Sequence, residues 1–179
     1  MFFPAGFYYK TFMWPPSFWY KIYEPFIRMA AGFGEASIKH DKERYEHKYE
    51  YCDLLITGSG PSGLASAYSA AKNGARVILA EDKPRFGGSL LTSDVNIGNQ
   101  TGVEWAEKII AELKTMPNVT VKNRSQVFGY YDHNMLVMSE RISDHLPKTQ
   151  KYLPKQRLWY IRANEVLISS GSIERPLVF

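Results

Sequence analysis

The sequence has little cysteine and no long uninterrupted hydrophobic run, and each scarcity excludes a class of protein. Cys52 is the single cysteine among 179 residues, so the chain forms no intramolecular disulfide and builds no cysteine-based zinc site or iron–sulfur cluster of its own. This cysteine usage favours a reducing compartment, and we expect a cytoplasmic protein. Cys52 lies at the start of an apolar run, which predicts an inert core thiol.

Charge of one sign is also not concentrated anywhere in the chain. Lys and Arg number 22 and Asp and Glu number 18, which leaves a net charge of +4. The most charge-dense stretch, residues 39–50, mixes both signs, whereas binding to a phosphate backbone needs a concentrated basic face. The sequence therefore predicts no nucleic-acid partner. We interpret residues 39–50 as a charged linker or an exposed helix.

The first 34 residues are rich in aromatic side chains but lack the pattern of an export signal or a membrane span. Twelve aromatic residues lie within residues 2–26, and prolines and lysines interrupt the stretch. A transmembrane helix needs roughly 20 consecutive apolar residues, and a signal peptide needs an unbroken apolar core. We expect no membrane contact. Residues 1–38 are interpreted as a packing segment that covers either a partner protein or the core of its own domain, since aromatic side chains are enriched in both.

Residues 51–81 have the pattern of one strand–helix–strand unit. The apolar run at 51–57 ends in glycine, which is typical of a buried parallel strand. Residues 61–73 begin with proline and are followed by Gly74, an asymmetry typical of helices. Residues 76–81 are predicted to be a second strand, which makes a right-handed βαβ unit.

The remaining pattern extends this α/β unit. Apolar residues at helical spacing predict a helix over 101–115, followed by a third parallel strand over 119–122. Short β segments predict a small antiparallel layer at 127–131, 135–138 and 158–162. Another buried strand is predicted over 166–169.

The segment between the first strand and the first helix fits the G-x-G-x-x-G pattern of dinucleotide-binding loops. The first glycine permits a tight turn, the second lets the backbone approach a pyrophosphate, and the third lets the helix pack close to the sheet. The anion would lie at the helix N-terminus, where free N–H groups favour negative charge. The predicted cofactor contacts in the loop are Gly58, Ser59, Gly60, Pro61, Ser62 and Gly63.

The second predicted strand ends in acidic residues at the distance expected for a ribose contact. Glu81 follows the loop by about 20 residues, and Asp82 adjoins it. Because an acidic group repels a phosphorylated ribose, this end favours NAD or FAD over NADP. After it, the paired glycines Gly87 and Gly88 are predicted to let the chain pass close to the pyrophosphate, and Ser89 to donate a hydrogen bond to it.

No residue pattern indicates a catalytic group or a metal site. His133 and His145 each follow an aspartate directly, which is more typical of turn and cap residues than of a general base.

These motifs resemble the two-dinucleotide-binding domain of flavin- and pyridine-nucleotide-dependent oxidoreductases. Longer strings resemble the alpha subunit of heterotetrameric sarcosine oxidase, namely residues 11–15, 131–133, 144–147, 156–159 and 171–179. The resemblance covers nearly the whole chain. It implies a partial doubly wound, three-layer FAD/NAD(P)-binding (Rossmann-like) α/β fold with a small antiparallel β layer over residues 51–179. It also implies that this domain is incomplete at its C-terminus, because such subunits are far longer.

The resemblance further implies a bound NAD, with FAD as the alternative, because both cofactors place an ADP half in the same loop. By position it carries over Ser62, Glu81, Asp82, Lys83 and Ser89 as cofactor contacts. It also places Val127 beside the adenine. The implied reaction is oxidative demethylation of sarcosine to glycine, with formaldehyde or methylene-tetrahydrofolate and hydrogen peroxide as products.

In this interpretation FMN and FAD are bound elsewhere in a complex with beta, gamma and delta subunits, and this chain is an oxidoreductase portion that is not catalytic alone. Two alternatives stay open. One is an FAD-binding subunit of an amine, opine or cyanide-forming dehydrogenase. The other is a non-catalytic scaffold that holds NAD and offers its aromatic segment to partner subunits.

Overall fold

The computed structural model describes residues 15–32, 34, 36–147 and 152–172. They belong to two compact units, Met1–Lys42 and Glu43–Phe179. The first unit contains η1, a π-helical turn (Trp19–Tyr23) that continues into α2 (Glu24–Ala30), and neither element has a buried residue. Much of the aromatic-rich segment and most of the 171–179 string lie outside the described residues.

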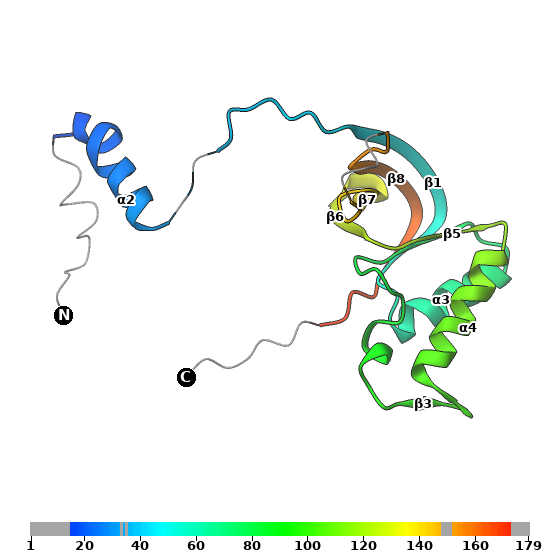
Figure 1. Ribbon diagram of the computed structural model, residues 1–179. Helices are drawn as coiled ribbons and strands as arrows, with labels where there is room; N and C mark the ends of the chain where they lie inside the picture. Colours follow the sequence, from blue (N-terminus) through cyan, green and yellow to red (C-terminus); the bar gives the residue numbers. More distant parts are fainter. Residues whose placement is uncertain (1–14, 33, 35, 148–151, 173–179) are drawn as a thin grey trace. The chain divides into compact units, whose positions relative to one another are not determined.

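Six strands of the second unit form one mixed sheet (Figure 1). Its order is β5-β2-β1-β8-β7-β6, in which β5, β2, β1 and β8 are parallel and β7 and β6 are antiparallel to their neighbours. The strands are β1 (Tyr45–Thr57), β2 (Val77–Ala80), β5 (Val119–Lys122), β6 (Ser125–Tyr131), β7 (Met135–Arg141) and β8 (Gln156–Ile168). A separate ribbon pairs β3 (Asn96–Ile97) with β4 (Gln100–Thr101).

Two strands are longer than the sequence predicts. Residues 45–50, expected to be part of a linker or exposed helix, form the first half of β1. The segments 158–162 and 166–169, expected to be separate strands, are one continuous strand, β8. The cause is mutual pairing, because β1 and β8 run parallel from the Tyr45–Gln156 pair to the Thr57–Ile168 pair. Charged side chains lie between the tyrosines of this half of β1, so the local sequence pattern does not indicate a strand there. Strand preference depends instead on neighbours in space.

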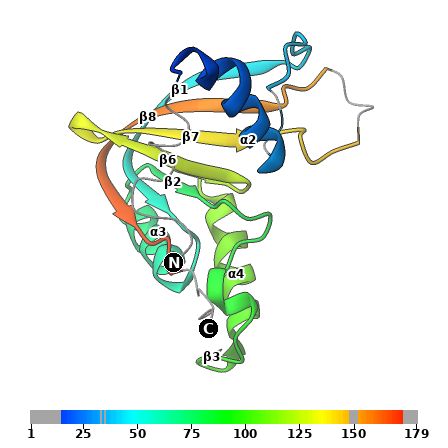
Figure 2. The ribbon, with the colours of Figure 1, turned by 90° about the vertical axis from the view of Figure 1, so that its left-hand side faces the viewer.

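Two helices cover one face of the parallel half of the sheet, and both confirm the predicted helices. α3 (Pro61–Lys72) and α4 (Gly102–Thr115) lie side by side beneath the strands in Figure 2. α4 begins with a capping box, in which Thr101 Oγ1 accepts from Glu104 N at 3.3 Å and Glu104 Oε2 accepts from Thr101 N at 2.9 Å. The core under the helices consists of Ile56, Leu64, Ala67, Ala71, Val77, Leu79, Leu90, Ala106, Ile109, Ile110 and Leu113.

The antiparallel half packs on the opposite face of the parallel strands. β1 and β8 curve strongly, and β7 and β6 follow the same curve (Figure 1). A second core fills the space inside this curve, and it consists of Cys52, Leu55, Ile78, Ala80, Leu136, Met138, Trp159, Ile161 and Ala163. The result is three layers, with helices, parallel strands and antiparallel strands in that order, which confirms the predicted α/β fold class. Among the described residues, no helix has the length and apolar character needed to cross a membrane.

Candidate functional site

The glycine loop follows the carboxyl end of β1, between the two strands that pair with β1. β2 pairs with one side of β1 and β8 with the other, and ligands of open α/β sheets bind at such a switch point. Gly58 N donates to Ala80 O at 2.8 Å, and Ser169 Oγ donates to Gly58 O at 2.9 Å. The loop is therefore held between the carboxyl ends of β2 and β8.

The positions of this loop are occupied by glycine for different physical reasons. Gly58 has a φ of +99°, and a Cβ there would lie 2.3 Å from the carbonyl oxygen of Ser169. A Cβ on Gly63 would lie 2.0 Å from the carbonyl oxygen of Gly58. The packing of this chain alone requires these two glycines. Gly60 has an ordinary φ of −67°, and within the part of the chain that the structure describes a Cβ on it would meet no atom within 4 Å.

Gly60 is also the N-cap of α3. It has no side-chain cap, and Pro61 follows at the first helical position. The first-turn N–H groups of α3 therefore remain suited to an anion. Gly88 belongs to the 3-10 turn η2 (Gly88–Leu91), and a Cβ there would lie 2.8 Å from Gly60 Cα. Open space thus remains beside Gly60, next to a turn that approaches it closely, and this arrangement fits a pyrophosphate.

Glu81 joins the end of β2 to the loop. Its side chain is buried, with an exposed fraction of 6%. Oε2 accepts from Ser59 N at 2.9 Å and from Ser59 Oγ at 2.5 Å, and Oε1 accepts from Lys83 N at 3.0 Å. Ser59 has no exposed surface, and its N–H and hydroxyl both point to Glu81. The predicted direct contact between Ser59 and a cofactor is therefore at odds with its burial.

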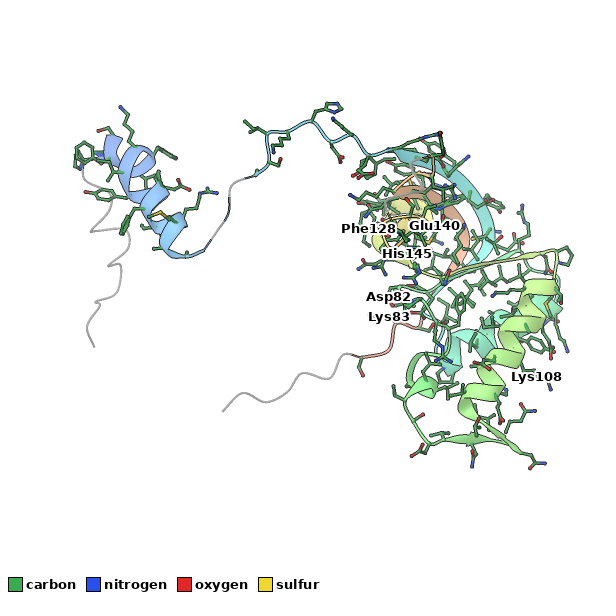
Figure 3. The ribbon with its side chains drawn as sticks, in the orientation of Figure 1. Asp82, Lys83, Lys108, Phe128, Glu140 and His145 are labelled. Carbon is green, nitrogen blue, oxygen red and sulfur yellow. The ribbon has the colours of Figure 1, made fainter. Side chains whose placement is uncertain are left out.

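Asp82 and Lys83 follow Glu81 and are exposed (Figure 3). Their side chains form an ion pair at 3.1 Å. A hydrogen bond with the Glu81 carboxyl, followed by the Lys83 ammonium, holds the pKa of Asp82 below its ordinary value. Arg141 Nη2 also donates to Asp82 O at 2.8 Å. Negative and positive groups therefore stand together directly after Glu81.

The other predicted contacts lie on neighbouring segments. Ser89 is exposed in η2, and Val127 is half-buried on β6, where it pairs with Met138. The backbone of β6 reaches the end of β2 because Ser125 N donates to Glu81 O at 2.8 Å. The fold thus brings the glycine loop, the end of β2, the Gly-Gly turn and the start of β6 together.

Neither Asp-His pair enters this arrangement. His133 lies exposed with a φ of +58° in the turn η3 (Asp132–Asn134), and His145 pairs with its own neighbour Asp144 at 3.4 Å. Among the described residues, no group of three or more His, Cys, Asp or Glu side chains could hold a metal ion.

Gly87, the first glycine of the predicted Gly-Gly turn, supports the loop from a neighbouring segment. Its N–H lies 3.0 Å from Ser59 O and 3.2 Å from Ser59 Oγ. Its φ of +126° gives it a conformation that favours glycine. The Gly-Gly pair itself was the available signal, because a turn that needs two glycines often approaches another backbone closely.

An open glycine turn at a helix N-terminus, beside a buried carboxylate at the switch point of a parallel sheet, defines a dinucleotide-binding α/β domain. The family model described as FAD dependent oxidoreductase matches residues 53–144, about half of the chain. The chain belongs to this family.

Several relatives share the sequence or the fold. The sarcosine oxidase alpha subunit of Rhizobium meliloti (strain 1021) is 47% identical over 175 residues, which cover 98% of this chain and 18% of that protein. An opine oxidase subunit of Agrobacterium tumefaciens (strain Ach5) is 25% identical, over 72% of this chain and 25% of that protein. L-proline dehydrogenase from P. horikoshii shares the fold, with a TM-score of 0.57 at 18% identity, covering 81% of this chain and 27% of that chain. This chain therefore spans a quarter or less of either curated relative.

Proposed function

We propose that this chain is the dinucleotide-binding portion of the alpha subunit of a sarcosine oxidase-like flavoenzyme, and that its glycine loop binds the ADP half of NAD. The observation that carries this proposal is the open space at Gly60. Two other loop glycines are required by the packing of the chain, whereas a Cβ at Gly60 would meet no atom of the described residues within 4 Å. A glycine is best explained there by a ligand that needs the space.

Each proposed contact has a distinct part in binding. The first-turn N–H groups of α3 and the Ser62 hydroxyl would hold the pyrophosphate, while Gly88 permits its close approach. Glu81 would accept a hydrogen bond from a ribose hydroxyl through its carboxylate, whose Oε1 also accepts from Lys83 N at 3.0 Å. Val127 would flank the adenine.

The activity proposed for the whole enzyme is oxidative demethylation of sarcosine, supported by the 47% identity to a sarcosine oxidase alpha subunit. The bound dinucleotide and flavins would supply the redox chemistry. We assign no catalytic role to the described side chains of the proposed site, and the part we propose for this chain is to bind and orient a cofactor. Beta, gamma and delta subunits are the proposed partners.

FAD is the second candidate cofactor. The match to the FAD dependent oxidoreductase family favours it, as does the similarity to a subunit of opine oxidase. FAD and NAD share the ADP half, so the loop geometry accommodates either. In this case the chain would hold the flavin itself.

Isothermal titration of the full chain with NAD, FAD and ADP tests both candidates. We expect NAD and ADP to bind, and Gly60→Val to abolish binding while the circular dichroism spectrum is unchanged, because the backbone at Gly60 accepts a side chain. Ser69→Val adds the same branched group on the exposed far half of α3 and should bind normally. Tight binding of FAD alone would favour the second candidate. Retained affinity in Gly60→Val would refute the loop assignment.

A further inference from the structure

We infer that the hydroxyl of Ser59 is a positioning group that orients the Glu81 carboxylate, so that the site recognises an adenosine whose ribose carries free hydroxyls. This inference rests on the proposed function, because it concerns how the proposed site reads its ligand. Ser59 itself touches no ligand, since it has no exposed surface.

The Glu81 carboxylate is held at both of its oxygen atoms. Ser59 donates twice to Oε2, through its N–H at 2.9 Å and through its hydroxyl at 2.5 Å. Lys83 N donates to Oε1 at 3.0 Å. Both Ser59 bonds go to Oε2, so together they fix which oxygen faces the loop. Oε1 is then the oxygen on the side of Lys83.

The Ser59 hydroxyl also has a second partner. Its oxygen lies 3.2 Å from Gly87 N, whose proton is shared with Ser59 O at 3.0 Å. The hydroxyl proton is therefore directed toward Glu81, because the oxygen accepts from the other side. One buried hydroxyl thus links the glycine loop, the end of β2 and the Gly-Gly turn.

Loss of this hydroxyl should loosen the carboxylate without moving the backbone. In Ser59→Ala the N–H of residue 59 still donates to Oε2, and Gly87 N still donates to the carbonyl oxygen of residue 59. The loop and the turn therefore keep their backbone connection. The carboxylate loses one of its two anchors on Oε2 and gains rotational freedom, so its hydrogen bond to a ribose hydroxyl becomes weaker.

The test compares binding of ADP and of 2′,3′-dideoxy-ADP, which differ only in the two ribose hydroxyls. For the unaltered chain we expect ADP to bind about tenfold tighter, the effect of one hydrogen bond to a charged group. In Ser59→Ala we expect this preference to fall to about threefold or less, while binding of dideoxy-ADP stays the same. Ser59→Gly removes the same hydroxyl and serves as a second variant if Ser59→Ala does not give a native circular dichroism spectrum.

Two comparison variants separate positioning from a general effect on the loop. Ser62→Ala alters an exposed residue of the first turn of α3 and should weaken both ligands equally, so that the preference for ADP is kept. Glu81→Gln should lower the preference by itself. Adding Ser59→Ala to Glu81→Gln should lower it no further, because Ser59 acts through Glu81.

The outcomes distinguish this inference from the proposed function. A reduced preference in Ser59→Ala, with the preference kept in Ser62→Ala, supports the positioning role. An unchanged preference in Ser59→Ala, or equal weakening of both ligands, overturns the inference and leaves the proposed function intact. Equal binding of ADP and dideoxy-ADP by the unaltered chain overturns the inference together with the proposed contact between Glu81 and the ribose, and leaves the proposed binding of ADP by the glycine loop intact. Absence of ADP binding by the unaltered chain refutes both.

Discussion

An ion cluster around Glu140 joins the parallel and antiparallel halves of the sheet. On β7, Glu140 accepts hydrogen bonds from Trp159 Nε1 at 2.6 Å, from Arg157 Nη1 at 3.3 Å and from Lys122 Nζ at 3.3 Å. The Lys122 ammonium also lies 4.1 Å from the centre of the Trp159 ring. The side chains of Lys122 and Glu140 are only 13% and 15% exposed. Lys122 is the last residue of β5, so this cluster connects the two halves.

We predict that Glu140→Ala strongly destabilises the fold. The substitution removes one acceptor from three donors and leaves the Lys122 cation with little access to water. Removal of one partner from a fully buried ion pair costs about 3–5 kcal/mol. Because these side chains keep some exposure, we expect a loss of about 2–4 kcal/mol in the free energy of unfolding. Glu140→Gln keeps an oxygen for the Trp159 N–H, and we expect about half that loss.

Urea denaturation followed by tryptophan fluorescence and circular dichroism measures this loss. The matched control is Glu107→Ala. Arg85 and Glu107 form an ion pair at the same 3.3 Å, but both side chains are 65% exposed. The control should change the free energy of unfolding by less than about 0.5 kcal/mol. Equal losses for Glu140→Ala and Glu107→Ala would refute the argument that burial sets the value of the cluster.

Three further predictions concern single residues of the same unit. Gly63→Ala should lower the free energy of unfolding by about 1–3 kcal/mol or more in urea denaturation, because the new Cβ would lie 2.0 Å from the Gly58 carbonyl oxygen; a fully stable variant would contradict this packing. The Arg76 N–H and guanidinium hold the pKa of Asp53 below its ordinary 3.8, so this carboxylate stabilises the fold above pH 3.8 and loses that effect as the pH falls through its lower folded-state value. The stability difference between the unaltered chain and Asp53→Asn should therefore shrink in denaturation curves recorded below pH 3.8, and a constant difference would refute the assignment. Burial raises the pKa of the Cys52 thiol to about 12, so a thiol-specific reagent should label Cys52 in urea but not in buffer; labelling of the folded chain would contradict its burial.

Elements of the fold with a strong local pattern could be predicted from the sequence. The helix expected at 61–73 is α3, and the strand expected at 119–122 is β5 with the same bounds. Both are specified by residues close in sequence, through helix-end signals and a short apolar run. The first half of β1 could not be predicted in this way. Its partner strand is β8, and the pair Glu46 and Arg157, which join side chains at 2.9 Å, are 111 positions apart.

The candidate site shows the same division. The loop glycines and Glu81 could be predicted because their spacing is that of a βαβ unit. Why each position is glycine could not be predicted. A side chain at Gly58 would collide with Ser169 and one at Gly63 with Gly58, whereas no described residue blocks a side chain at Gly60. Ser59 appeared in the motif as a cofactor contact, and only its burial against Glu81 indicates a supporting part instead.

Local periodicity and short spacing in the chain were enough to specify the βαβ unit, the glycine loop, the acidic strand end and the class of ligand that such a loop suits. Contacts in space were needed to establish that β1 and β8 form one long curved pair, that the antiparallel strands cover the second face of the sheet, and that Ser59 turns away from the open side of the loop. These last features depend on contacts between residues far apart in the chain. The local sequence pattern does not show which distant residues meet or how strongly their contacts stabilise the fold.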